Sequence, residues 1–390
     1  MVGPHELILA WSCLLLSVVA CVSAPNAPPS IGPTAQPTVG ITATASDGAG
    51  RTSPVPTTGS TATPESSCPP LTIEPPQVSH FDSVEGINAL GYSDDGLALV
   101  LLESGLTVPI HPLTTLGLDG VDRAFAWSPD ATEIAFLHTD SGSEYCARGF
   151  VMLAELSSGQ VRLLLEKPGL YSRPVWSPDG QRLAFIEEAG ELMVVQLRDG
   201  GLTTLSRDAL GGVAPAWIDT EHVAYLRRTG DERLVDLVNQ ALEGSAPSTI
   251  LADELPFSEL ALSPDGRQLA YYGGTLILVD LGSGAKQYLG TEPSERLQWS
   301  PDGRYLLGRG GLAGVYLVEP ALSDVRQLDF LGLPGPTQQS WAPDSLQFAA
   351  LLGTDGSART TIGIYDLDRG ILRELPIVVE PPYELAWSPR

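Results

Sequence analysis

The stretch Val175–Gly180 reads VWSPDG, and close copies of its central letters return along the whole second part of the chain. The copies are WSPD at Trp127, AWIDT around Trp217, LSPDG at Leu262, WSPDG at Trp299, WAPDS at Trp341 and WSPR at Trp387. Together with Trp176 they mark seven positions separated by 37 to 49 residues. A period near forty residues is typical of stacked supersecondary units.

The residues after each motif indicate what such a unit contains. VWSPDG is followed by QRLAFIEEAG, ELMVVQLRDG and GLTTLSRDAL, which are three short apolar segments separated by Gly and Asp turns. Alternating patterns with β-branched residues and hairpin punctuation predict strands. With the strand that carries the Trp, each unit has four strands, as in a propeller blade. No stretch after residue 80 has a long, well-capped helical pattern, so we expect an all-β fold.

The motif itself has the composition of a turn. Pro fixes φ near −65°, Asp can accept hydrogen bonds from nearby backbone N–H groups, and Gly permits positive φ. The Trp ends the preceding strand and offers a large surface for packing between neighbouring blades. The repeated residues therefore build the scaffold, and we do not interpret them as seven active sites.

A second pattern marks the outer hairpin: an aliphatic residue, a Gly three positions later and an aliphatic residue five after that. It appears at 154–164, 195–205, 279–289 and 365–375. It also occurs upstream of every Trp motif, as VLLESGLTVPI at 100–110. The N-terminal segment around it supplies the second, third and fourth strands of a blade, whereas PYELAWSPR at 382–390 supplies only a first strand. We therefore predict a seven-bladed β-propeller over 78–390 with one-plus-three closure. The strand around Leu385–Trp387 should pair antiparallel with the strand around Ile87–Tyr92, which removes free sheet edges.

These WSPDG turns resemble those of the TolB-type β-propellers. The resemblance covers about residues 80 to 390, with six close copies of the motif and a degenerate one at Trp217. This chain departs from the six-bladed TolB pattern in having seven motifs and no N-terminal α/β domain. A function tied to that domain is therefore not implied.

The N-terminus has the features of an export signal. Leu7–Ala20 is an apolar run too short to span a bilayer comfortably, and VVAC at Val18–Cys21 resembles a bacterial lipobox. We expect residues 1–20 to be a lipoprotein signal peptide and Cys21 to be lipidated. The leader MVGPHE departs from the usual pattern because it has no Lys or Arg. The alternatives are plain secretion after cleavage at Ala24 and a retained membrane anchor.

Residues 21–77 are expected to form a disordered tether. Residues 22–77 hold 12 of the 33 prolines and only four charged residues. Such a segment has too little apolar content to offset the entropy of ordering the chain.

The net charge of −25 limits the kinds of partner that the chain can bind. An acidic surface repels phosphate backbones, so we expect no nucleic-acid partner. Solubility explains the charge most simply, and a cationic partner is the alternative.

The cysteines predict one disulfide. Once Cys13 leaves with the signal and Cys21 is lipidated, Cys68 and Cys146 remain. Exported proteins live where such pairs oxidise. We predict that they are bonded, with two free thiols as the alternative.

Known catalytic and cofactor motifs are not apparent in the sequence. There is no G-x-S-x-G elbow of the kind used by hydrolases with a preceding propeller. The five His are scattered and form no H-x-x-H or H-E-x-x-H pair, so no metal site is predicted. GRGGLA at 308–313 is flanked by strand-like segments and is interpreted as a hairpin turn. We expect no cofactor.

The candidate binding residues lie at the mouth of the central funnel. The residues three before each motif position enter the innermost strands near the axis, and five are polar or charged: Arg173, Glu259, Arg296, Gln338 and Glu384. Ala124 and Ala214 complete the set. One interpretation is a solvated rim with mutual ion pairs, and the other is a pocket or a protein-binding rim.

Together these features suggest a surface-anchored lipoprotein in the bacterial cell envelope. Its propeller would serve as a non-catalytic module that binds or scaffolds a protein or ligand. Two alternatives stay open: an enzyme acting from the funnel on a saccharide or peptide, and an extracytoplasmic sensor. The sequence does not identify the ligand.

Overall fold

The computed structural model divides the chain between Thr63 and Pro64, and all described residues lie in the second unit. The described residues are 79–80, 84, 88–93, 96–110, 120–140, 148–165, 169, 171–229, 234–256, 260–310, 314–328, 338–353, 360–379 and 384–389. Cys21, Cys68, Cys146 and Glu259 lie outside them. The statements below concern the second unit.

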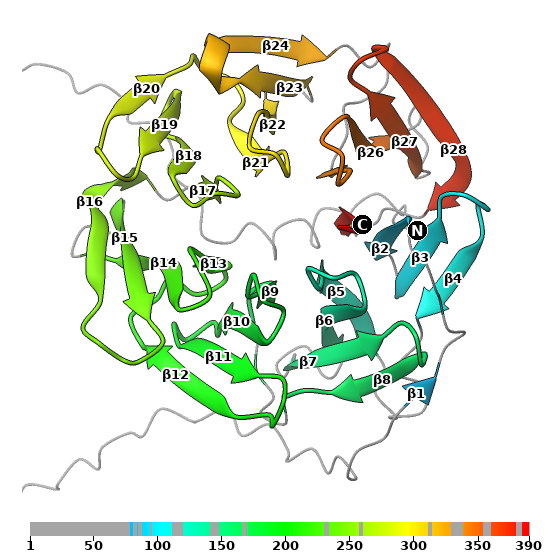
Figure 1. Cartoon of the computed structure of the whole chain (residues 1–390), viewed down its shortest axis with the longest axis horizontal. Coiled ribbons are helices and arrows are strands. Elements are labelled where there is room, and N and C mark those ends of the chain that lie inside the picture. Colours follow the sequence, from blue (N-terminus) through cyan, green and yellow to red (C-terminus); the bar gives the residue numbers. More distant parts are fainter. Residues whose placement is uncertain are drawn as a thin grey trace, which may run out of the picture. The chain divides into compact units, whose positions relative to one another are not determined.

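The strands form seven antiparallel sheets arranged as the blades of a ring (Figure 1). The first blade contains β5 (Gly120–Trp127), β6 (Glu133–Asp140), β7 (Arg148–Glu155) and β8 (Gln160–Leu163). The second contains β9 (Val175–Trp176), β10 (Arg182–Ile186), β11 (Leu192–Gln196) and β12 (Leu202–Ser206). The third contains β13 (Ala216–Trp217), β14 (His222–Arg228), β15 (Leu234–Ala241) and β16 (Ser248–Pro256).

The remaining blades have the same order of strands. The fourth contains β17 (Leu260–Leu262), β18 (Gln268–Tyr272), β19 (Leu276–Asp280) and β20 (Lys286–Tyr288). The fifth contains β21 (Glu295–Trp299), β22 (Leu306–Gly310), β23 (Gly314–Glu319) and β24 (Asp324–Leu328). The sixth contains β25 (Gln339–Trp341), β26 (Gln347–Gly353), β27 (Thr360–Asp366) and β28 (Ile371–Val379). The seventh contains β29 (Glu384–Trp387), β2 (Ala89–Ser93), β3 (Leu97–Leu101) and β4 (Thr107–Ile110).

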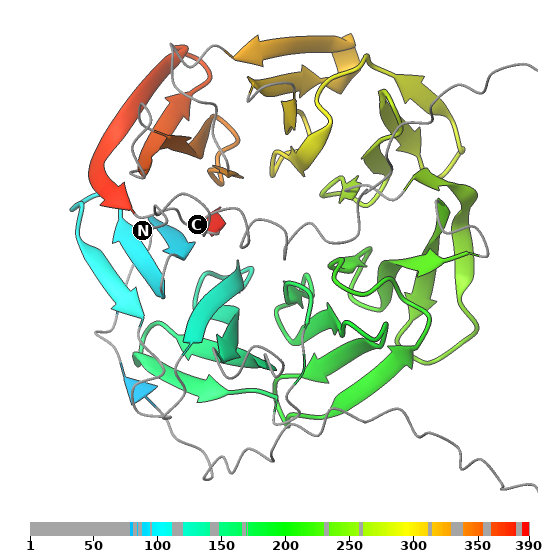
Figure 2. The same ribbon diagram turned by 180° about the vertical axis from the view of Figure 1, so that it is seen from behind.

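The seventh blade confirms the predicted one-plus-three closure. β29 pairs antiparallel with β2, with Leu90 opposite Trp387 and Tyr92 opposite Leu385. Figure 2 shows the same blade from behind, with the red C-terminal strand beside the blue N-terminal ones. Ser388 extends the pairing, because its backbone N–H donates to the Ala89 carbonyl at 2.9 Å and its Oγ accepts from the Ala89 N–H at 3.2 Å. The ring is closed by strands from both ends of the unit.

One strand was not predicted. β1 (Ser79–His80) pairs antiparallel with β8 and adds a fifth, outermost strand to the first blade. Val84 follows it, is buried, and donates its N–H to the Leu156 carbonyl at 2.9 Å. A two-residue strand has no periodicity that the sequence could reveal.

The motif turns are held by internal hydrogen bonds. In the second blade, the Ser177 hydroxyl donates to Asp179 at 2.6 Å and accepts from the Arg182 N–H at 2.9 Å. Gly180 has a φ of 69°. In two copies that lack this glycine, Ala131 and Ser345 take the same left-handed conformation, with φ of 58° and 59°. The turn geometry is therefore kept even where its preferred residue is replaced.

The motif tryptophans lie between blades, as predicted. In five of the six, the indole Nε1 donates to the backbone carbonyl of the residue just before the motif position in the neighbouring blade. The pairs are Trp127 with Ala386 (3.2 Å), Trp176 with Ala126 (2.9 Å), Trp217 with Val175 (3.0 Å), Trp299 with Ala261 (3.0 Å) and Trp341 with Gln298 (3.1 Å). Trp387 instead donates to Asn88 Oδ1 at 3.0 Å.

The core consists of apolar clusters between adjacent blades. One cluster joins Leu99 of the seventh blade to Phe125, Phe136 and Phe150 of the first, all fully or almost fully buried. Burial of such side chains is the main force that holds neighbouring blades together. The single helical element among the described residues is a 3-10 turn, Pro320–Leu322. No described helix is long and apolar enough to cross a membrane.

Candidate functional site

The ring has two faces with different connections. Because the strands of a blade alternate in direction, the residues before the innermost strand lie on the same face as the hairpin between the second and third strands. We call this the loop face. The opposite face, called the turn face, carries the WSPDG-type turns.

Connections on the two faces differ in length. On the turn face the inner turns have similar lengths, from four residues (218–221) to six (300–305). On the loop face the connections range from three residues (273–275) to eleven (164–174). Variable connections on a rigid scaffold are where propellers and other folds carry binding residues. Those of the predicted residues that the structure describes lie at this loop face.

Two of the predicted residues form an ion pair. An Arg173 guanidinium nitrogen lies 2.6 Å from Oε1 of Glu384. The second oxygen of that carboxylate, Oε2, accepts the Phe125 N–H at 3.0 Å. The Arg173 side chain is 48% exposed and that of Glu384 is 16% exposed. The carboxylate is therefore the better shielded partner and makes contacts to two other blades.

Ala124 lies in the blade between these two residues. It has a φ of 51°, and the register between β5 and β6 shifts between Arg123 and Ala126. Its methyl side chain leaves room for the longer side chains on either side. The same device occurs in the fifth blade, where Arg296 also has a φ of 51° and the register shifts between Glu295 and Gln298. Such bulges re-aim side chains at the end of a strand.

Two other predicted residues take part in backbone hydrogen bonds on this face. The Arg296 side chain is exposed, and its carbonyl accepts a hydrogen bond from Gln339 Nε2 at 2.9 Å. Gln338 is partly buried, and its carbonyl accepts the Leu351 N–H at 3.0 Å. The alanine of the third blade, Ala214, is exposed.

A buried polar pair near the loop face was missed from the sequence. Nδ1 of His138 in β6 lies 2.9 Å from Asp122 Oδ1 in β5, and the exposed fractions of the two residues are 0% and 2%. Asp122 Oδ2 accepts the Leu97 N–H at 3.2 Å, which ties the first blade to the seventh. Because a carboxylate can only accept, we assign the hydrogen to Nδ1. Nε2 is then buried without a hydrogen-bond partner among the described residues.

Acidic residues also lie near Tyr171 on this face. Burial raises the pKa of the Tyr171 hydroxyl, and the nearby carboxylates of Glu187 and Glu191 raise it further. Tyr171 therefore stays protonated at neutral pH. Its ring packs edge-on against Phe185 with 5.3 Å between the centroids.

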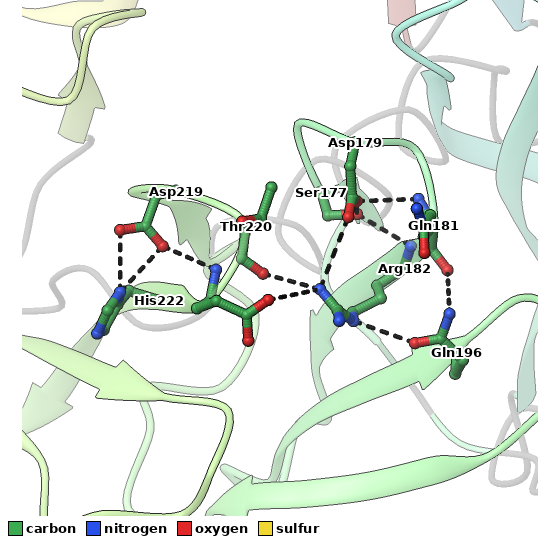
Figure 3. A network of polar contacts seen from close by, with 9 residues as sticks. Ser177, Asp179, Gln181, Arg182, Gln196, Asp219, Thr220 and His222 are labelled. Atoms are coloured by element: carbon green, nitrogen blue, oxygen red, sulfur yellow. Dashed lines mark hydrogen bonds and ion pairs between the residues drawn. The ribbon is translucent and has the colours of Figure 1, made fainter.

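The turn face carries a different polar network (Figure 3). Arg182 of the second blade donates to Gln196 Oε1 at 3.1 Å and to the Thr220 carbonyl of the third blade at 2.8 Å. Asp219 accepts from the Glu221 N–H and faces His222 Nδ1 at 2.9 Å. Burial acts to raise the pKa of Asp219, but these hydrogen bonds and the His222 imidazole hold it below its usual value. The network joins neighbouring turns and has a structural role.

No group of three or more His, Cys, Asp or Glu side chains in the described part of the chain could hold a metal ion. The His222 imidazole pairs with the single carboxylate of Asp219 and so closes the turn described above.

The fold and this geometry define the class of the protein, a seven-bladed β-propeller with WSPDG turns. No protein-family model matches the chain, and no curated protein matches it in sequence. Similar solved structures include a puromycin hydrolase mutant, with TM-score 0.55 and 15% identity over 78% of this chain and 54% of that one. An oligogalacturonate lyase in complex with manganese has TM-score 0.52 and 14% identity, covering 66% and 81%.

TolB from Acinetobacter baumannii is also similar, with TM-score 0.47 and 16% identity over 81% of this chain and 83% of that one. At such identities the likenesses concern the fold alone. The chain shares the β-propeller fold with these proteins.

Proposed function

We propose that this propeller is a non-catalytic binding module whose loop face takes a protein partner. The observation that carries the proposal is the asymmetry between the faces. The turn face is built from nearly uniform, internally hydrogen-bonded turns, whereas the loop face has connections of three to eleven residues. A rigid ring that presents variable loops on one side is suited to recognition.

The charges on the loop face support a polar interface. Arg296 is exposed, while the Arg173–Glu384 pair neutralises its own charges and fixes the strands beneath. Polar rims with a few well-placed Arg residues are common in protein interfaces. The net charge of −25 keeps the chain soluble and disfavours a nucleic-acid partner.

We also propose that the module is displayed on the cell envelope through a lipid on Cys21. VVAC directly after the apolar run, followed by the Pro-rich segment up to residue 77, supports this arrangement. The intact mass of membrane-extracted protein should show a diacylglyceryl-Cys N-terminus. A mature protein without lipid that begins at Pro25 would overturn the anchor but not the binding role.

The binding role is tested by affinity capture from envelope extracts with the full chain as bait. Arg296→Glu changes an exposed charge on the loop face, and Arg267→Glu makes the same change on the turn face. We expect captured proteins to be lost with Arg296→Glu and retained with Arg267→Glu. Equal capture by both variants would reject the loop face. Turnover of a saccharide or peptide by the purified chain would instead favour an enzyme.

A further inference from the structure

One of the seven blade interfaces lacks the tryptophan that the others share. Leu262 occupies the motif position of the fourth blade and lies opposite Leu269, as Trp176 lies opposite Leu183. By the repeat, the indole at this position would donate to the carbonyl of Ala216, the residue before Trp217. Leucine is smaller than tryptophan and has no N–H to donate.

A cavity of about 170 Å³ lies at this interface. Its lining is aliphatic apart from Tyr225, and it includes both Ala216 and Leu262. Ile250, Leu260 and Leu281 form further parts of the wall. The cavity therefore lies between the third and fourth blades, where an indole ring is replaced by a shorter side chain.

The cavity has one polar feature in an otherwise apolar wall. A backbone carbonyl has two lone pairs, and the pairing of Ala216 with Ala224 in the sheet uses at most one of them. At five other interfaces the corresponding carbonyl accepts an indole N–H at 2.9 to 3.2 Å. Ala216 lines the cavity, so by the repeat we infer that its second acceptor position points into it. The cavity is large enough for a single aromatic ligand, since an apolar cavity of roughly 150 Å³ can bind benzene.

We propose that this cavity binds a small planar aromatic molecule of the indole class, with its N–H donated to the Ala216 carbonyl. The other interfaces show which chemical group fits this position, because their tryptophans place an indole there. The volume excludes sugars and nucleotides, whose sites are typically about 300 Å³ or larger. Ala214 is exposed and also lines the cavity, so the site is reached from the loop face.

The probe for this site is indole itself, measured by ligand-observed NMR and calorimetry on the full chain. We expect one saturable site with a Kd on the order of 0.1 mM, as is reasonable for so small a ligand. Benzothiophene has nearly the same shape without the N–H. It should bind roughly fivefold more weakly, the value of one net hydrogen bond.

Leu262→Trp should abolish indole binding, because the new side chain fills the cavity and supplies its own N–H to Ala216. The matched control is Leu322→Trp, which adds the same side chain at an exposed position on the fifth blade and should leave binding unchanged. If Leu262→Trp does not fold by circular dichroism, Leu262→Phe tests the filling of the cavity more mildly.

Three results would overturn the proposal: no saturable binding of indole by the natural chain, undiminished binding by a folded Leu262→Trp or Leu262→Phe variant, or equal affinities for indole and benzothiophene. The first two reject the site. The third rejects the role of the Ala216 carbonyl, and with it the indole class.

Discussion

Arg173 and Glu384 are 211 positions apart in sequence, and their side chains meet at 2.6 Å across an intervening blade. Arg173 belongs to the second blade, Glu384 to the closing strand of the seventh, and Ala124 of the first lies between them. The same carboxylate accepts the Phe125 N–H from that first blade. One side chain of the closing strand therefore links three consecutive blades at the joint where the ring is completed.

The two partners should contribute unequally to stability. Glu384→Ala leaves the Phe125 N–H without its acceptor and removes the ion pair, so we expect a loss of about 2 kcal/mol in the free energy of unfolding. Arg173→Ala removes the ion pair of a half-exposed guanidinium and should cost less than about 1 kcal/mol. Urea unfolding of the variants measures both values.

Glu384→Gln is the control for this interpretation. The amide oxygen can still accept the Phe125 N–H, so this variant should lose little more than Arg173→Ala does. Similar losses for Arg173→Ala and Glu384→Ala would show that the ion pair, and not the backbone contact, dominates.

The motif turns should make the propeller sensitive to acid. The Ser263 hydroxyl and the Arg267 N–H donate to Asp265 and hold the pKa of its carboxyl below the usual value. The pKa values of Asp130, Asp179 and Asp302 are lowered in the same way, although burial acts to raise them. A carboxyl with a lowered folded-state pKa contributes stability above its unfolded pKa, about 4, and that stability is lost as pH falls through the folded pKa.

Ser263→Ala tests one of these turns. We expect the pKa of Asp265 to rise and the acid-side loss of stability to become shallower, as followed by carboxyl NMR titration and by urea unfolding at several pH values. Ser283→Ala is the matched control, because Ser283 makes the corresponding hydrogen bonds to Asp280. It should raise the pKa of Asp280 and leave that of Asp265 unchanged. If the pKa of Asp265 is unchanged in the Ser263→Ala variant, the Ser263 hydroxyl is not what lowers it.

The buried Asp122 should be intolerant of a near-isosteric change. Its two oxygens accept from His138 and from Leu97 of the neighbouring blade. An asparagine offers one acceptor and places its NH₂ group against the other donor. Asp122→Asn should therefore lower the free energy of unfolding by about 2 kcal/mol, within the range for an unpaired buried group.

Asp324→Asn makes the same chemical change at an exposed position and should stay within about 0.5 kcal/mol of the natural chain. Equal unfolding midpoints for the two variants would mean that water or a rearranged His138 satisfies the pair.

The sequence was sufficient to predict the number of blades and their closure. Each blade is marked by its own local turn chemistry, and the order of strands within a blade follows from the period, so neither depends on distant contacts. The residues three before the Trp lie near the starts of the inner strands: Glu384 begins β29, Arg296 is the second residue of β21, and Arg173 lies two residues before β9. Their role in binding stays a prediction.

What those residues contact could not be predicted. The Arg173–Glu384 pair spans the first blade, and the carboxylate also contacts the Phe125 N–H beside a bulge whose position is set by β5 and β6 together. The same register shift makes Asp122 face His138, which no fixed spacing indicates. The carbonyls that accept the indole N–H groups are backbone atoms and leave no mark in the sequence. The sequence shows only that Leu262 replaces the Trp at one motif position.

The disulfide between Cys68 and Cys146 stays a prediction, because both residues lie outside the described part of the chain. In the sequence, both cysteines lie near described strands of the first blade: Cys68 precedes β1, which pairs with β8, and Cys146 is two positions before the start of β7. Eleven residues separate Cys68 from Ser79, a reach of at most about 40 Å.

Such a bond would close a loop of nearly eighty residues and contribute about 4 kcal/mol in the chain-entropy model. We expect non-reducing peptide mass spectrometry of the exported protein to show the two cysteines in one linked peptide. Cys68→Ser and Cys146→Ser should lower the unfolding midpoint equally, and the double variant should add nothing to either single change. Alkylation of both thiols in the folded, unreduced protein would refute the bond, and additive losses in the double variant would argue that each cysteine acts alone.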